Sequence, residues 1–253
     1  MAKNKDFKPI GFILYENEEF DWDFFLKTLS EDYGITTDEK VSKDTSSESL
    51  IFDVDGATMI VSFMPFPVPN GEAEENAKNN FLWQNGAEQV KKHKSQIILA
   101  FFHMNEDNPT VENYKLFIKF ADSLLKCPSS VGIYTNATVY PSEFYCENAE
   151  VLKDNEDLPV QIMIYIGLYA DKNGICGYTY GLKNFGYREI EILDSKQSPG
   201  DVYGFLCSVS EYVLAYDVML RDNETIGFSA EQKLPIRLSV GKAVEGQSLK
   251  IGF

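Results

Sequence analysis

The chain has 253 residues, of which 44% are hydrophobic, including 18 Phe and 14 Tyr, and this composition excludes an intrinsically disordered regulator. Its 39 acidic residues outnumber 23 basic ones, which gives a net charge of −16. This charge argues against nucleic acid or an anionic membrane as a partner, because each phosphate contact has to overcome a repulsive field. It favours high solubility or a basic protein partner.

The start of the chain and its cysteines favour a cytoplasmic location. Met1-Ala-Lys-Asn-Lys-Asp6 has no apolar stretch of the kind that a secretory signal requires, and the longest apolar runs are only of strand length. The four cysteines (Cys127, Cys146, Cys176 and Cys207) are widely spread and show no Cys-x-x-Cys spacing. That pattern is typical of free thiols in a reducing compartment, so we expect no zinc site.

The first part of the chain predicts alternating strands and helices. A strand at Ile10–Tyr15 precedes a helix that begins at Asp21-Trp22-Asp23, with acids in its first turn, and ends at Gly34. Residues 50–64 predict a hairpin with Asp55-Gly56 at its turn. The elements expected next are an extended Pro65–Pro69 segment, a helical stretch over Glu72–Lys94 that is broken near Asn85-Gly86, and a strand at Gln96–His103.

The order strand–helix–strand–strand–helix–strand over residues 10–103 is that of a split β-α-β, ferredoxin-like unit. We therefore predict an α+β fold in which helices pack on a mostly antiparallel sheet, extended by a C-terminal α+β half. The predicted halves are residues 1–158 and residues 159–253. They are either two lobes or one continuous domain that shares a sheet.

The rest of the chain predicts further elements of both kinds. The expected helices are Val111–Lys126, Ser142–Leu152 and a long one from Pro199 through Leu220; the expected strands are Val131–Val139, Val160–Tyr169, Cys176–Tyr180, Thr225–Phe228, Ile236–Val240 and Ser248–Gly252. Between them, Glu189, Ile190, Glu191 and Ile192 alternate with a period of two. This alternation predicts a half-buried strand that carries its acids on the solvent face.

Several motifs carry a resemblance to a known family. The C-terminal patch, residues 160–253, is marked by Tyr180-Gly-Leu-x-x-Phe-Gly-Tyr-x-Glu-Ile-Glu191 and Gly227-Phe-Ser-Ala-Glu-Gln-Lys-Leu-Pro-Ile-Arg237. The N-terminal patch includes Phe20-Asp-Trp22, Val54-Asp-Gly56, Met64-Pro-Phe-Pro-Val-Pro69 and His93-Lys-Ser-Gln-Ile-Ile98. Together they resemble an uncharacterised bacterial family, domain of unknown function 4261. The resemblance implies a soluble bacterial protein with no assigned activity and no cofactor.

The Gly-Leu-x-x-Phe-Gly-x-x-Glu-Ile pattern is also similar, more faintly, to suppressor-of-fused-like domains among bacterial toxin-immunity proteins. This second similarity is an analogy at the level of the fold. It implies that the chain acts by binding another protein.

Few residues offer acid–base or metal chemistry. The two histidines are His93, expected to cap a helix end within Lys91–Lys94, and His103, expected at the end of a buried strand. Glu189 and Glu191 share a strand face at a separation of about 6.5–7 Å. Such a pair can run glycosidic chemistry or hold a hard cation, although acids on an exposed strand are more commonly just solvated. We assign no catalytic, cofactor-binding or metal-binding residue.

An aromatic group accompanies the two glutamates. Tyr178, Tyr180 and Tyr187 either form a recognition groove or fill the core. Together with Glu189 and Glu191, they are the tentative ligand or partner surface.

The sequence favours a non-enzymatic protein-binding module, an immunity-type or regulatory partner of a basic protein. The alternative is a small-ligand receptor or hydrolase that uses the Glu189 and Glu191 strand, which predicts a pocket there and a raised carboxyl pKa. A third possibility is a structural subunit of an oligomer. The identity of the partner and the oligomeric state stay open.

Overall fold

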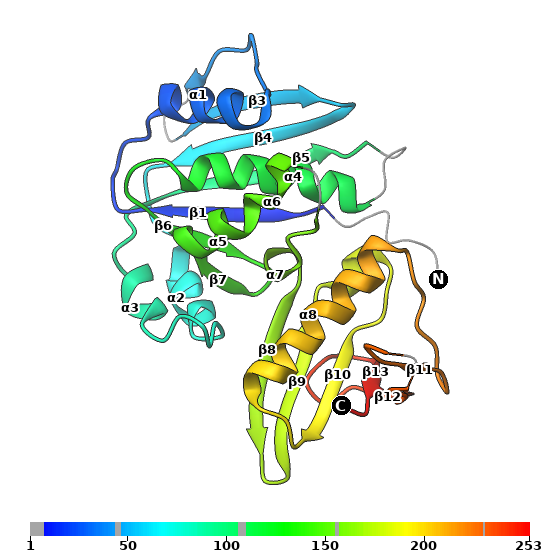
Figure 1. Ribbon diagram of the computed structural model, residues 1–253. Helices are drawn as coiled ribbons and strands as arrows, with labels where there is room; N and C mark the ends of the chain where they lie inside the picture. The colour runs from blue at the N-terminus through cyan, green and yellow to red at the C-terminus, as the bar shows by residue number, and fades with distance from the viewer. Residues whose placement is uncertain (1–7, 44–46, 106–109, 155–156, 230) are drawn as a thin grey trace. The chain divides into compact units, whose positions relative to one another are not determined.

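The protein has an α+β fold, as predicted, and forms two compact units (Figure 1). The computed structural model describes residues 8–43, 47–105, 110–154, 157–229 and 231–253. We call Lys5–Ile162 the N-terminal unit and Met163–Phe253 the C-terminal unit. Each unit has its own sheet, so the described strands of the two halves do not share one.

The N-terminal unit is built on a seven-stranded sheet with the order β2-β3-β4-β5-β1-β6-β7. All neighbouring strands are antiparallel. The strands are β1 Ile10–Tyr15, β2 Ser42–Lys43, β3 Glu48–Val54, β4 Ala57–Met64, β5 Ser95–His103, β6 Ser130–Thr135 and β7 Thr138–Pro141.

Helices cover both faces of this sheet. They are α1 Trp22–Tyr33, α2 Glu72–Ala77, α3 Gly86–Val90, α4 Thr110–Leu125, α5 Ser142–Ala149, α6 Val151–Asp154 and α7 Val160–Met163, with a 3-10 turn η1 at Pro69–Gly71. Successive side chains of the inner strand β1 point alternately to the helices on the two faces of the sheet. Tyr15 donates a hydrogen bond to the carbonyl of Leu124 in α4, whereas Leu14 joins a cluster with Ala77 of α2 and Val90 of α3. This alternation buries β1 on both sides.

Local sequence signals placed the first elements correctly. The Asp21 carboxylate accepts a hydrogen bond from the N–H of Phe24 at 3.0 Å and so caps α1, and Gly34 ends the helix in a left-handed conformation with φ 66°. Asp55 and Gly56 join β3 to β4 with positive φ angles of 51° and 78°. Two positive φ angles are what a two-residue hairpin turn of type I′ requires.

The ferredoxin-like detail is not confirmed. In a split β-α-β unit, one strand lies between two parallel strands that a helix connects. Here α1 leads from β1 toward β3, but β4 and β5 both lie between them, and three successive antiparallel pairings make β1 and β3 antiparallel. The split arrangement occurs instead at β5–α4–β6, where β1 lies between two strands that run parallel to each other.

Several predicted boundaries were wrong, among them the helical stretch Glu72–Lys94, which is helical only at Glu72–Ala77 and Gly86–Val90. The expected strand Val131–Val139 is the hairpin β6–β7, because Asn136 and Ala137 adopt positive φ angles of 49° and 58° and reverse the chain. The expected strand Val160–Tyr169 begins with the helical turn α7, and the strand starts only at Tyr165. The expected long helix ends at Ala215 rather than at Leu220.

The C-terminal unit has a six-stranded sheet with the order β11-β12-β13-β10-β9-β8. Its strands are β8 Tyr165–Asp171, β9 Gly174–Tyr180, β10 Ile190–Ser195, β11 Thr225–Ile226, β12 Leu234–Val240 and β13 Gln247–Ile251. Strands β10 and β13 are parallel, and the other pairs are antiparallel. A 3-10 turn, η2 Leu182–Phe185, follows β9.

Helix α8 (Pro199–Ala215) packs on β8, β9 and β10 (Figure 1). Its start is fixed by a capping box between Ser198 and Asp201. Gly177 of β9 permits a close approach, because a Cβ there would lie 2.8 Å from side-chain atoms of Val202 and Leu206. Among the described residues, none of the helices has the length and apolar character needed to cross a membrane.

Candidate functional site

Glu189 and Glu191 are buried, so the prediction that they lie on a solvent face was wrong. Their exposed fractions are 2% and 0%. The two glutamates were expected on the solvent-exposed face, because strict alternation of polar and apolar residues usually marks a strand with one face in the core and one in solvent. Here two turns, a nearby one at residues 181–183 and a distant one at residues 242–243, cover that face and supply hydrogen-bond donors to the two carboxylates.

The Glu189 carboxylate holds the turn that contains η2. Its oxygens accept hydrogen bonds from the Thr179 hydroxyl at 2.7 Å and from the N–H groups of Gly181 and Lys183 at 2.9 and 3.2 Å, with Leu182 N–H at 3.4 Å. The free N–H groups at the start of a helical turn form a natural anion site. Burial raises the pKa of Glu189, and these hydrogen bonds offset that rise only in part.

The Glu191 carboxylate holds a second turn, the connection between β12 and β13. It accepts hydrogen bonds from the N–H groups of Lys242 at 3.0 Å and Ala243 at 2.6 Å, and from the Ser248 hydroxyl. The Lys250 ammonium lies 2.6 Å away. Burial alone raises the pKa of Glu191, but the Ala243 N–H, the Lys250 ammonium and the other donors together lower it below its ordinary value.

The Glu-Ile-Glu motif therefore works as a pair of loop anchors. Each glutamate binds the backbone of a different turn, while Ile190 between them and Ile192 after them are buried. A carboxylate that is already surrounded by donors has little capacity left to bind a ligand or transfer a proton. The Glu189 carboxylate binds the N–H groups of Gly181 and Leu182, which explains why the sequence motif contains both a Gly-Leu turn and this glutamate.

Glu191 makes stability depend on pH. Its pKa is lower in the folded protein than the value near 4.3 of an unfolded chain, so the stabilisation is present above about pH 5 and is lost as the pH falls through the folded pKa. We expect the difference in unfolding free energy between wild type and Glu191→Gln to be largest at pH 7 and to narrow below about pH 4. Urea unfolding at several pH values measures it. A difference that stays constant from pH 7 to pH 3 would contradict this assignment.

The three predicted tyrosines lie in different environments. Tyr178 is half-buried and packs between Tyr165 and Tyr169, with ring centroids 6.1 and 6.4 Å away. Tyr180 is 47% exposed. Tyr187 is buried, and its hydroxyl donates to Asp217 beyond the end of α8. The predicted surface is therefore not one site: Tyr187 is structural, and Tyr180 is the exposed member.

The sheet face opposite α8 explains why Tyr178 sits where it does. Its neighbour Gly177 faces α8, so Tyr178 points to the other side. Gly167, paired with Tyr178 across the strands, makes room for the ring, because a Cβ at Gly167 would lie 2.2 Å from its Cζ atom. This contact fixes the Tyr178 ring as a packed element of the sheet.

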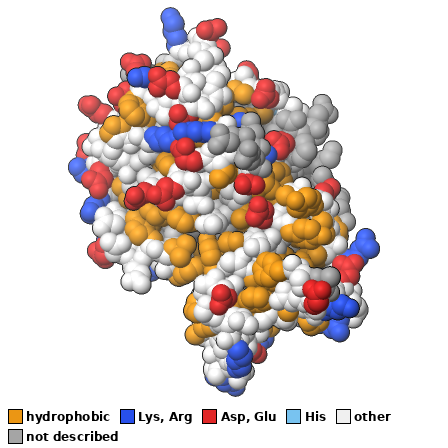
Figure 2. Space-filling view, in the orientation of Figure 1, with side chains coloured by type: hydrophobic (Ala, Val, Ile, Leu, Met, Phe, Trp, Pro, Cys, Tyr) orange, Lys and Arg blue, Asp and Glu red, His pale blue; other side chains and the backbone are white. Residues whose placement is uncertain are grey.

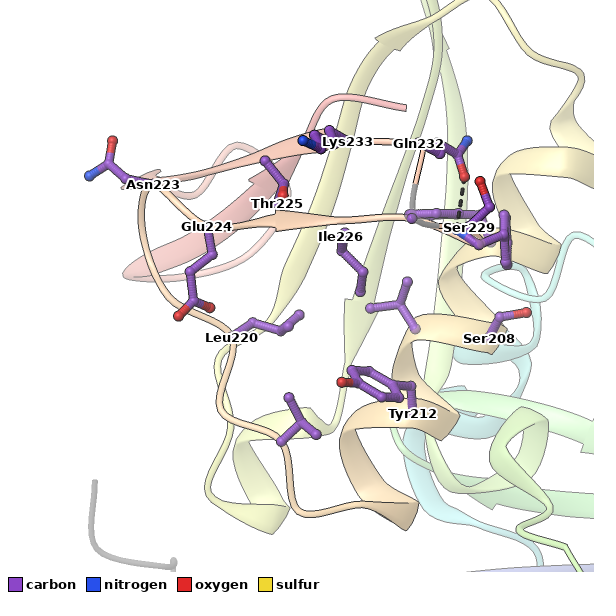
Figure 3. Close-up of a pocket in the computed structure, with 15 residues that line it drawn as sticks. Ser208, Tyr212, Leu220, Asn223, Glu224, Thr225, Ile226, Ser229, Gln232 and Lys233 are labelled. Carbon is purple, nitrogen blue, oxygen red and sulfur yellow. Dashed lines mark hydrogen bonds between the residues drawn. The ribbon is translucent and has the colours of Figure 1, made fainter.

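The C-terminal unit has a groove of about 800 Å³ between α8 and residues 218–229 and 232–233 (Figure 3). We call it the α8 groove. Phe205, Ser208, Val209 and Tyr212 of α8 line one wall, and Ile226 of β11 lies on the other. Figure 3 shows the side chains of Tyr212, Leu220 and Ile226 directed toward the hollow. Its volume is within the range of small-molecule and peptide sites.

Aromatic rings pack together at the α8 groove. The Phe205 ring stacks on Phe253 with centroids 4.1 Å apart and meets the edge of Phe228 at 5.4 Å. Tyr212 is 43% exposed and Phe228 is 67% exposed. Sequence reasoning missed this groove, although the spacing of Phe205, Val209 and Tyr212 on one side of α8 is a signal that could have drawn attention to it.

The histidines have structural or solvent-facing positions. The Nε2 atom of His93 accepts a hydrogen bond from the N–H of Val68 at 3.0 Å, so Nδ1 carries the proton that is donated to the carbonyl of Val90. His93 therefore makes the expected contact with the end of α3, but as a buried neutral ring rather than as a cation. His103 is exposed at the end of β5.

One group of three side chains among the described residues has the spacing of metal ligands. The ligand atoms of Asp171, Cys176 and Asp194 lie within 4.8 Å of one another. The Cys176 sulfur already accepts a hydrogen bond from the N–H of Asp194. A structural zinc site has four protein ligands and calcium takes six to eight oxygens, so these three side chains alone complete neither of those sites.

The C-terminal unit is thus an α+β domain that combines two buried glutamate anchors with an open apolar groove. Residues 178–252 match the model of the family described as Domain of unknown function (DUF4261). The match includes both anchors, α8 and the groove, whereas the motifs quoted for residues 20–98 lie outside it. Comparison with curated proteins and with solved structures gave no significant match. The suppressor-of-fused-like similarity stays a prediction.

Proposed function

We propose that the protein is a cytoplasmic, non-enzymatic module that captures a basic protein, as an immunity-type or regulatory partner does. The observation that carries this proposal is the distribution of charge. Residues 5–162 hold 28 acidic and 13 basic residues, a net charge of −15, whereas residues 163–253 hold 11 acidic and 9 basic residues. The N-terminal unit therefore concentrates the field that attracts a cationic partner.

Part of this charge lies in one exposed run. Glu16, Glu18, Glu19, Asp21 and Asp23 follow β1 and lead into α1, and all five are exposed. Figure 2 shows acidic side chains on the visible face of the N-terminal unit. Asp21 also caps α1, but the three glutamates have no such role in the helix. They are suited to long-range attraction, which decays over about 8 Å at physiological salt.

The positions of the residues most suited to chemistry support a non-enzymatic role. His93 is held between two backbone groups, and Glu189 and Glu191 each accept hydrogen bonds from a turn. A receptor or hydrolase built on the two glutamates stays the alternative. It requires five backbone N–H groups to lose their acceptors, which is costly for buried donors.

The proposal is tested by replacing Glu16, Glu18 and Glu19 together with Gln. We expect the wild-type protein, immobilised at low salt, to retain one dominant basic protein from native lysate in near-equal amount, and a salt step to release it. The triple variant is expected to bind that purified protein about tenfold more weakly, because charges at an interface rim act mainly through attraction at a distance. Binding is measured by titration calorimetry.

A second triple variant is the matched control. Glu31, Glu75 and Glu88 form ion pairs with Lys27, Lys78 and Lys91, respectively. Their replacement by Gln changes the net charge as much as the first triple variant does. It removes acids whose charge is already paired with a neighbouring lysine. This control is expected to bind nearly as well as the wild type. Equal losses in both triple variants would contradict recognition by the 16–19 run, and failure of the wild type to retain any basic protein would remove the proposal itself.

A further inference from the structure

A β-bulge in β10 brings Asp194 next to Cys176 of β9. The register of the two strands shifts between Ile192 and Ser195, so that Leu193 and Asp194 both stand opposite Cys176. Bulges of this kind turn a side chain away from the face that it would otherwise take. Asp194 adopts a positive φ angle of 56°, and its N–H donates a hydrogen bond to the Cys176 sulfur at 3.3 Å.

Asp171 of β8 completes a group of three ligand atoms. Gly177 faces α8, so its neighbour Cys176 points to the other side of the sheet. Cys176 pairs with Tyr169, and Asp171 lies two residues after Tyr169 on the same strand, so it shares that side. One ligand atom each from Asp171, Cys176 and Asp194 lie within 4.8 Å of one another. Three neighbouring strands thus contribute one potential ligand each.

The Asp194 carboxylate lacks the partner that a buried acceptor needs. Its Oδ1 atom is buried and accepts no hydrogen bond in the described part of the chain. Lys196, two residues later, donates to the carbonyl of Asn173 instead. A buried polar atom without a partner is costly, and an ordered ion or water is a common explanation for one. A cation between Asp171, Cys176 and Asp194 would satisfy this oxygen and would also offset the repulsion between the two carboxylates.

The mixture of sulfur and oxygen selects the cation. Mg²⁺ and Ca²⁺ take oxygen ligands, and Cu⁺ prefers sulfur, whereas Zn²⁺ binds Cys at about 2.3 Å and Asp at about 2.0–2.2 Å. In tetrahedral coordination these bonds place the ligand atoms roughly 3.5 Å apart. Asp171 is exposed, so rotation of its side chain can close the remaining distance. The N–H of Asp194 orients the Cys176 sulfur, as hydrogen bonds to metal ligands commonly do.

We propose that Asp171, Cys176 and Asp194 bind one Zn²⁺ ion, with water as the fourth ligand. The expectation of no zinc site rested on the spacing of the cysteines, whereas this site joins one cysteine to aspartates of the two neighbouring strands. The ion fastens the end of the β8–β9 hairpin to the bulge of β10. The proposed site is independent of the proposed function, and either can fail without the other.

The test is a calorimetric titration of the chelator-treated full chain with Zn²⁺. We expect saturable binding in a 1:1 ratio and a higher melting temperature with the ion, because it stabilises the folded state that it binds. Co²⁺ in its place is expected to give the near-ultraviolet absorption band of a thiolate–metal bond. Ca²⁺ is expected to bind far more weakly, because the site offers it only two acidic side chains. No saturable Zn²⁺ binding, no thiolate band with Co²⁺, or equal binding of Ca²⁺ and Zn²⁺ would overturn the proposal.

Three substitutions that nearly preserve size locate the ion. Asp194→Asn keeps a residue type that tolerates a positive φ angle, so the bulge is expected to persist. We expect Asp194→Asn and Asp171→Asn each to weaken Zn²⁺ binding by about 100-fold or more, because even loss of an outer-shell partner costs about 10–100-fold. Cys176→Ser is expected to weaken it as much and to abolish the Co²⁺ band.

Two matched variants are the controls. Cys207→Ser removes another buried thiol of the same unit, and Asp38→Asn removes an exposed acid of the other unit. Both are expected to bind Zn²⁺ with wild-type affinity, and an equal loss in Cys207→Ser would place the ion elsewhere and overturn the proposal. Wild-type affinity in Asp194→Asn would also overturn it, even if Cys176→Ser fails to fold. Hydrogen exchange is expected to show that Zn²⁺ protects residues 171–176 and 192–195.

Discussion

Replacing Lys126 with Met is expected to destabilise the protein by about 3–5 kcal/mol, the usual effect of leaving a buried charge without its partner. The Lys126 ammonium lies 2.5 Å from Asp122 and 2.7 Å from Asp32. Asp122 is fully buried on α4, and its carboxylate also accepts a hydrogen bond from the Tyr33 hydroxyl at 2.8 Å. Burial by itself lowers the pKa of Lys126, but the hydrogen bonds to Asp122 and Asp32 raise it above its ordinary value.

The double variant Lys126→Met/Asp122→Leu is the control for this prediction. It removes both charges, so most of the lost stability is expected to return, as it does when a buried ion pair is replaced by apolar residues. Urea unfolding gives the free energies. A loss of less than 1 kcal/mol in Lys126→Met, in the range of a surface ion pair, would show that the charge of Asp122 is not buried as the structure has it.

Replacing Glu189 with Gln is expected to lower the free energy of unfolding by about 2–4 kcal/mol. The reason is that the amide NH₂ of Gln then faces backbone N–H groups that donate hydrogen bonds to the carboxylate in the wild type. The affected donors are Gly181, Leu182 and Lys183. They form the turn that leads from β9 to β10, so the damage is expected to concentrate there. Hydrogen exchange of the Gly181 and Lys183 amides, together with urea unfolding, measures both effects.

Glu245→Gln is the matched control for Glu189→Gln. Glu245 is exposed and lies in the same unit, in the loop between β12 and β13. Its substitution is expected to change stability by no more than about 0.5 kcal/mol. Similar stability and similar amide exchange in the two variants would refute the role of Glu189 as a loop anchor.

The elements that the sequence predicted well are those whose chemistry is local. Asp21 and Gly34 mark the ends of α1 through contacts within a few residues, and Asp55-Gly56 suffices to build its own turn. Capping and positive φ angles depend on residue type at one position, so a single sequence reveals them. The α+β class followed from the same local signals.

The order of strands and the burial of Glu191 depend on distant contacts. β5 is inserted between β4 and β1, which no local pattern indicates. Glu191 is covered by Lys242 and Ala243, which lie more than fifty residues later. A two-residue period shows that a strand has two faces, but it does not show whether a later loop covers the polar one.

The α8 groove was missed for a related reason. Phe205, Val209 and Tyr212 have the spacing of a buried helix face, and sequence alone does not distinguish a stripe that meets a sheet from one that meets an open space. Phe205 and Val209 are in fact buried, while Tyr212 at the end of the stripe is 43% exposed. The groove lies between α8 and residues 218–229 and 232–233 (Figure 3).

The most direct test of the proposed function is the affinity for the captured basic protein as a function of salt. Titration calorimetry with the full chain is expected to show 1:1 binding at low salt that weakens at least tenfold between 50 mM and about 500 mM salt, because the acidic N-terminal unit attracts the partner through its field. Binding that does not change over this range, or no basic protein that binds in a defined ratio, would contradict it.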